Sequence, residues 1–109
     1  MASRKDFLRA VWKEVIDAPM TEHWIDNAIR TAEKTPNAPF GTVGITVKRL
    51  LELGATRRDL SCLNRFAAYE AIFSVLYMLE DPGLDPNDSA MLHESLLKAD
   101  PSGREGRAE

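Results

Sequence analysis

The side chains that could perform acid–base or nucleophilic chemistry at neutral pH are few: Cys62, His23 and His93. The two histidines fall in separate predicted helices with no catalytic motif around either. Cys62 lies near a predicted helix start among arginines, which favours the reactive thiolate, but it also lies between Leu60 and Leu63, where a buried inert thiol is expected. These three scattered ligands lack the paired spacing of a metal site. The sequence therefore predicts no enzyme, no cofactor and no metal, with a thiol or histidine enzyme as the less favoured alternative.

Basic side chains gather where two predicted helices meet, in residues 47–65. Residues 47–60, VKRLLELGATRRDL, resemble the core of a helix-turn-helix, with Gly54 at the turn and arginines opening the second helix. The resemblance implies a DNA-binding regulator whose second helix contacts phosphates and base edges. The candidate interaction surface consists of Lys48, Arg49, Arg57, Arg58, Ser61, Asn64 and Arg65. The alternative is that these residues are the solvated face of an ordinary helix.

Glu70 is the only carboxylate between Asp59 and Glu80. If its side of the helix is buried, the charge needs a partner, because an unpaired buried charge is very costly. The candidates are Arg65, one turn earlier, and His93, from the last predicted helix. The sequence therefore predicts a buried polar pair of Glu70 with Arg65 or His93.

A helix over residues 57–80 must position most of these side chains. A capping threonine opens it, and the sequence DPG at residues 81–83 ends it. From residue 71 to residue 79 only Ser74 and the Tyr77 hydroxyl are polar, and a helix that is apolar all round has to be buried all round. We therefore expect residues 71–79 to be a central core segment, or a segment that a second copy of the chain covers.

Four further helices are predicted around this one, at residues 3–18, 21–34, 42–53 and 85–99. The first two should pack antiparallel, because only a few residues join them. Alternating β-branched residues over residues 42–47 also fit a strand, but no other segment could pair with it, so a helix is favoured. The predicted fold is all-α: a compact bundle of about five helices around a central apolar helix, residues 57–80.

Length and composition limit the remaining possibilities. With 109 residues, 44% hydrophobic and 28% charged, the chain fits one globular domain. We expect a single helical domain over residues 1–101 and a disordered polar tail over residues 102–109. The single cysteine allows no internal disulfide and the charged N-terminus is not a secretory signal, so a cytoplasmic protein is expected. The apolar run is about half of the ~20 residues that a membrane span needs, so no membrane association is expected.

Charge and patterning together favour a protein partner. A net charge of −3, with an acidic C-terminal region, is unlike a protein that binds nucleic acid by overall charge. The leading hypothesis is a small protein–protein interaction module of adaptor, inhibitor or toxin-neutralising type that forms a homodimer through its central helices. The alternative is a helix-turn-helix-like DNA-binding regulator that uses residues 47–65, with nucleic acid a less favoured partner than protein.

Overall fold

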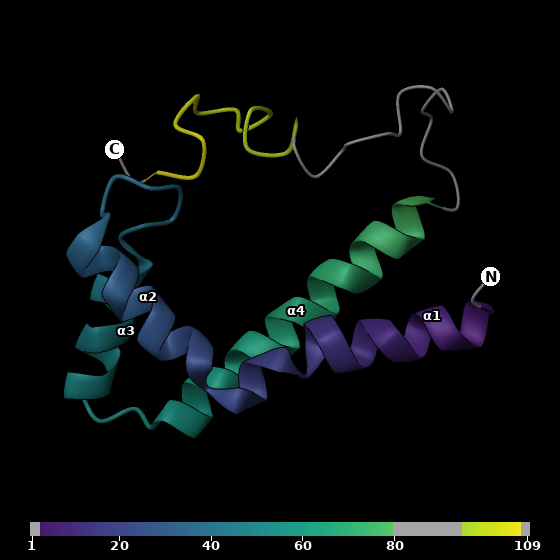
Figure 1. Ribbon diagram of the computed structural model, residues 1–109, viewed down its shortest axis with the longest axis horizontal. Helices are drawn as coiled ribbons and strands as arrows, with labels where there is room; N and C mark the ends of the chain where they lie inside the picture. Colours follow the sequence, from purple (N-terminus) through teal and green to yellow (C-terminus); the bar gives the residue numbers. More distant parts are fainter. Residues whose placement is uncertain (1–2, 80–94, 108–109) are drawn as a thin grey trace.

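The computed structural model describes residues 3–79 and 95–107. Its elements are all helical, as Figure 1 shows. They are α1 (Arg4–Val11), the π-helical turn η1 (Trp12–Ile16), the 3-10 turn η2 (Ala18–Thr21), α2 (His23–Lys34), α3 (Val43–Glu52) and α4 (Arg57–Leu79). The described residues contain no strand, so the predicted all-α class is confirmed, and residues 43–47 are helical, as favoured. Most of the fifth predicted helix, residues 85–99, lies outside the described residues.

Two helix starts follow from local sequence. The Ser3 hydroxyl accepts the Asp6 N–H at 3.1 Å while the Asp6 carboxylate accepts the Ser3 N–H, which forms a capping box on α1. The Thr56 hydroxyl accepts the Asp59 N–H at 3.0 Å and caps α4. Between α3 and α4, Gly54 has φ +110°, a value that side chains rarely allow. These interactions fix where α3 ends and where α1 and α4 begin.

The core lies where α2, α3 and the first turns of α4 meet. Ile25, Val47 and Leu60 are buried there. Ser61 is fully buried, and its hydroxyl accepts the indole N–H of Trp24 at 3.0 Å. Contrary to the prediction that the first two helices pair, α2 packs chiefly on α3. Contacts between α2, α3 and the start of α4 therefore hold this part of the fold together.

The second half of α4 is not a core segment of this chain. Phe73 is 56% exposed and Tyr77 is 69% exposed. The prediction that residues 71–79 are buried within the chain is wrong, because Ile72 and Leu76 are only half-buried and the others are exposed. α1 and α4 diverge beyond their crossing (Figure 1), and the start of α1 and the end of α4 border a hollow of about 270 Å³ lined by Arg4, Phe7, Leu8, Leu76 and Leu79. The radius of gyration is 16.3 Å, whereas about 13 Å is usual for a compact domain of this size. The bundle is thus more open than predicted.

The C-terminal segment lies against the loop between α2 and α3. The Phe40 N–H donates to the Gly106 carbonyl at 3.0 Å. The Asp100 carboxylate accepts the Gly106 N–H at 2.9 Å, and this hydrogen bond is the main cause that lowers the pKa of Asp100. Residues 102–107, which the sequence predicts to be part of a disordered tail, therefore have a defined contact with the body in this structure.

We expect Ser61→Ala to lower the free energy of unfolding by about 1 kcal/mol, because it removes the acceptor of the Trp24 indole N–H. Urea denaturation monitored by tryptophan fluorescence measures the change. Ser74→Ala, on an exposed side of the same helix, is the matched control and should leave stability unchanged. Equal stabilities of the two variants would contradict a contribution from the Trp24–Ser61 hydrogen bond.

Candidate functional site

The seven residues predicted as an interaction surface do not form one free surface. Ser61 is buried against Trp24, while Arg57 and Arg65 form ion pairs with other parts of the chain. Lys48, Arg49 and Arg58 are exposed and make no hydrogen bond or ion pair with any residue that the structure describes. Asn64 is half-buried. Three of the seven residues therefore have structural roles inside the fold.

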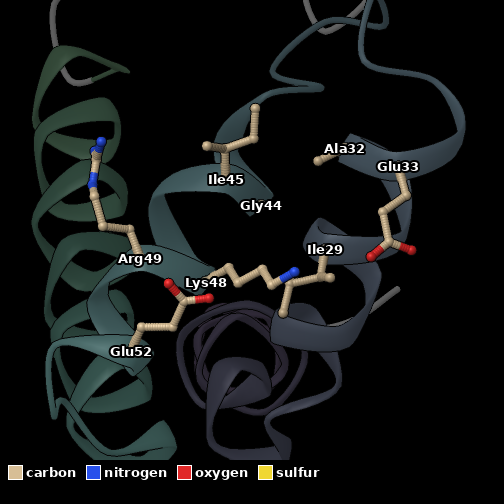
Figure 2. A pocket seen from close by; sticks show the side chains of 8 residues that line it. All are labelled: Ile29, Ala32, Glu33, Gly44, Ile45, Lys48, Arg49 and Glu52. Carbon is tan, nitrogen blue, oxygen red and sulfur yellow. The ribbon is translucent and has the colours of Figure 1, made fainter.

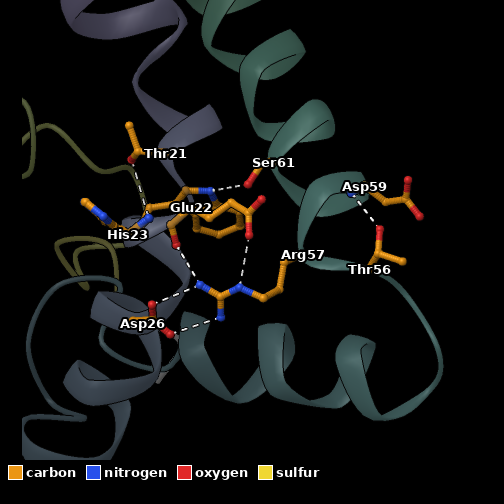
Figure 3. Close-up of polar contacts among 9 residues, drawn as sticks. Thr21, Glu22, His23, Asp26, Thr56, Arg57, Asp59 and Ser61 are labelled. Carbon is orange, nitrogen blue, oxygen red and sulfur yellow. Dashed lines mark hydrogen bonds and ion pairs between the residues drawn. The ribbon is translucent and has the colours of Figure 1, made fainter.

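Arg57 joins the start of α4 to the start of α2 (Figure 3). Its Nη1 and Nη2 donate to the two carboxylate oxygens of Asp26 at 3.1 and 2.9 Å. Its Nε and Nη2 donate to the carboxylate and the carbonyl of Glu22 at 3.1 and 3.2 Å. The hydrogen bonds to Asp26 and Glu22 raise the pKa of Arg57. The hydrogen bond between Arg57 and Asp26 in turn lowers the pKa of Asp26. This bidentate geometry is the strong form of an arginine–carboxylate pair.

Arg65 holds η1 and the following turn against α4. Its Nε lies 2.6 Å from Oδ1 of Asp17, and its guanidinium carbon lies 5.6 Å from the centre of the Trp12 ring. The predicted buried pair of Glu70 with Arg65 is therefore not formed: Arg65 engages Asp17, and Glu70 is exposed. The other predicted partner, His93, lies outside the described residues.

Lys48 and Arg49 border a pocket of about 440 Å³ between α2 and α3 (Figure 2). Its lining comprises Ile29, Ala32, Glu33, Gly44, Ile45, Lys48, Arg49 and Glu52. Two acidic and two basic side chains share the rim, so the pocket has no excess charge to attract an anion. The order helix, glycine turn, helix expected of a helix-turn-helix is present in α3 and α4, but Arg57, which opens the second helix, is held by carboxylates.

The candidate chemical groups remain separate. Cys62 is exposed, so the expectation of a buried thiol is wrong. It borders a shallow hollow of about 290 Å³ with Trp12, Arg65 and Tyr69. His23 is exposed at the start of α2. Within residues 3–79 and 95–107, no group of three or more His, Cys, Asp or Glu side chains is placed to hold a metal ion.

Sequence analysis missed the most prominent surface feature, a row of side chains on α4 that we call the α4 seam. It consists of Leu63, Phe66, Glu70, Phe73 and Tyr77, all of them exposed. Their spacing alternates between three and four residues, the heptad spacing with which helices pair in coiled coils. This signal is visible in the sequence. It went unseen because every other side of residues 71–79 is also apolar.

A row of neighbouring aromatic rings extends from η1 along α4 and includes Phe73 and Tyr77 of the seam. The ring centres of Trp12 and Tyr69 are 5.8 Å apart, those of Tyr69 and Phe73 are 6.2 Å apart, and those of Phe73 and Tyr77 are 6.4 Å apart. Rings at such distances attract one another and restrict each other's rotation. The aromatic part of the seam is therefore partly ordered before any partner arrives, which reduces the entropy lost on binding.

We expect Arg57→Ala to lower the denaturation midpoint clearly, because it leaves Glu22 and Asp26 without their shared cation. Arg58→Ala removes the same side chain at the next position and should have little effect, since Arg58 has no partner among the described residues. Thermal unfolding followed by circular dichroism compares the two variants. Equal midpoints would contradict the structural role of Arg57.

The same ion pair predicts an acid dependence of stability. Because Arg57 lowers the pKa of Asp26 from its ordinary value of 3.8, the folded state binds fewer protons there than the unfolded chain does. The stabilisation by this carboxylate is therefore complete above that value and is lost as the pH falls through the folded-state pKa. In the wild type the denaturation midpoint should fall as the pH is lowered from about 5 to about 2, a range of about one to two units around the ordinary pKa of an aspartate. Asp26→Asn should make this fall smaller. A profile identical to that of the wild type would contradict this prediction.

Among the described residues, no helix combines the length and apolarity that crossing a membrane requires. Comparison with protein-family models, with curated proteins and with solved structures finds no match, so any functional inference must come from the residues of this chain itself.

Proposed function

We propose that this protein is a helical protein–protein interaction module that binds a partner helix along the α4 seam. One observation supports this most strongly: a 23-residue helix presents large apolar side chains to solvent at the spacing of a coiled coil. Helix pairing through such a surface requires a complementary apolar face and no reactive group. Adaptors, inhibitors and toxin-neutralising proteins all act by contact of this kind.

The exposed apolar area on α4 is large for so small a chain. Its large apolar side chains that are more than half exposed are Leu63, Phe66, Phe73, Val75, Tyr77, Met78 and Leu79. Four of them, Leu63, Phe66, Phe73 and Tyr77, lie on one side of the helix as members of the seam, and together they expose on the order of 400 Å². The largest apolar patch of an ordinary monomer is about 300–600 Å² and is often functional. This area supports the assignment of α4 as a contact surface.

Photo-crosslinking in cells that produce the protein tests this proposal. Benzoylphenylalanine replaces Phe73 in the seam, and in a matched control it replaces Thr46, an exposed residue of α3. We expect one discrete protein adduct from position 73 and none from position 46. If position 73 gives no more adduct than position 46, the α4 seam is not an interaction surface.

DNA binding remains the second candidate, and the exposed cations Lys48, Arg49 and Arg58 are the observation that favours it. It predicts binding to duplex DNA that weakens steeply with salt, because phosphate contacts release counterions. Fluorescence anisotropy with labelled duplex DNA measures this salt dependence. A range of about 20 to 200 mM salt covers the concentrations over which phosphate contacts are lost. Unchanged binding after substitution of all three cations by alanine, or no binding at the lowest salt, would remove this candidate.

A further inference from the structure

We infer that the partner helix on the α4 seam is α4 of a second copy of this chain, running antiparallel to the first. The inference rests on the proposed function, because it names the partner of the same surface. Three features of the described residues favour a second copy in this orientation: the symmetry of the seam, its area and the place of its one charge.

The seam has nearly the same pattern in both directions along α4. Around Glu70, large apolar side chains stand seven residues away on both sides, at Leu63 and Tyr77. Phe66 stands four residues before Glu70 and Phe73 stands three residues after it. When two such helices lie antiparallel, with one shifted so that Glu70 faces Phe73 of the second copy, Phe66 of each copy faces Tyr77 of the other. A self-complementary surface of this kind is what a two-fold symmetric dimer requires.

The exposed area is sufficient for a stable dimer. The apolar members of the seam expose on the order of 400 Å². A typical stable interface buries about 800 Å² on each partner, of which only about 57% is apolar, so polar side chains that flank the seam can supply the rest.

The charge of Glu70 and the shape of the molecule distinguish the two orientations. A parallel two-fold pair places every seam residue beside its own copy, so the two Glu70 carboxylates would meet in the middle of an apolar contact and repel one another. An antiparallel pair avoids this with an offset of three residues, which sets Glu70 opposite Phe73 of the second copy. α2 and α3 lie at the N-terminal end of α4 (Figure 1), so antiparallel pairing also places the two bodies at opposite ends. Opposed helix dipoles favour the same arrangement.

The single cysteine makes the orientation measurable without a substitution. Cys62 is exposed and takes a nitroxide label. In an antiparallel pair centred near residue 71, the two labels are separated by about 25–30 Å, from a rise of ~1.5 Å per residue. In a parallel pair they are separated by about the interaxial distance, ~10 Å. Pulsed electron paramagnetic resonance on the full chain at tens of micromolar measures the longer distance, and dipolar broadening of the continuous-wave spectrum reports the shorter one.

We expect a distance near 25–30 Å that disappears in labelled Phe73→Glu protein. A distance near 10 Å would overturn the antiparallel arrangement, and no dipolar coupling at any concentration would overturn the second copy as partner. If coupling is absent while benzoylphenylalanine at position 73 still forms an adduct with another protein, this inference fails and the proposed function stands. If both signals are absent, both fail.

Discussion

Replacement of Gly44 by alanine is expected to destabilise the protein by about 3 kcal/mol, the upper end of the range of about 1–3 kcal/mol seen when a packed contact receives an extra group. A Cβ atom at position 44 would lie 2.1 Å from the carbonyl oxygen of Ala28 and 2.6 Å from its carbonyl carbon. These are backbone atoms of α2, so no side-chain rotation can relieve the overlap. α2 and α3 would have to separate, and the buried contact between Ile25 and Val47 would open with them.

Guanidinium denaturation followed by circular dichroism measures this effect. The measurement is best made in the Phe73→Glu background, because association would otherwise raise the apparent stability. Thr46→Ala, two residues further along the exposed side of α3, is the control and should change stability by less than about 0.5 kcal/mol. Alanine favours a helix over glycine by about 1 kcal/mol, so Gly44→Ala would be the more stable protein if the close approach of α2 and α3 were absent.

The second large effect is expected on association. Phe73→Glu should weaken self-association at least tenfold: each copy loses the burial of the exposed half of a large side chain, worth about 0.8–1.7 kcal/mol, and about 1.4 kcal/mol corresponds to tenfold in affinity. Phe73 is already more than half exposed in the single chain, so the variant should still fold.

Size-exclusion chromatography with light scattering over a concentration series measures this change. Thr46→Glu adds the same charge on α3, away from the seam, and should associate like the wild type. Undiminished association of Phe73→Glu, with an unchanged circular dichroism spectrum, would exclude the seam as the contact surface.

The helices that the sequence predicts well are those with local determinants. The side chains of Ser3 and Thr56 accept hydrogen bonds from the backbone N–H groups three residues later, and Gly54 has a positive φ that favours glycine. Helix ends of this kind can be predicted from a few neighbouring residues in the sequence. Such signals need no knowledge of which segments meet. The choice of helix over strand for residues 42–47 is different, because it rests on the whole sequence, in which no other segment has the pattern of a partner strand.

Contacts between distant segments could not be predicted in this way. Arg57 and Arg58 are identical in type and adjacent, yet only Arg57 meets Glu22 and Asp26, which precede it by more than thirty residues. Periodicity likewise shows that residues 71–79 are apolar but not what covers them. The prediction that the rest of the chain buries residues 71–79 is therefore wrong. The same apolar surface is instead the basis for proposing a partner helix.

Sedimentation equilibrium of the wild-type protein at tens of micromolar tests most directly whether a second copy covers the α4 seam. We predict a mass of twice 12.2 kDa that falls toward 12.2 kDa on dilution, and a mass of 12.2 kDa for Phe73→Glu at the same concentrations. A wild-type mass of 12.2 kDa throughout would contradict self-association through α4.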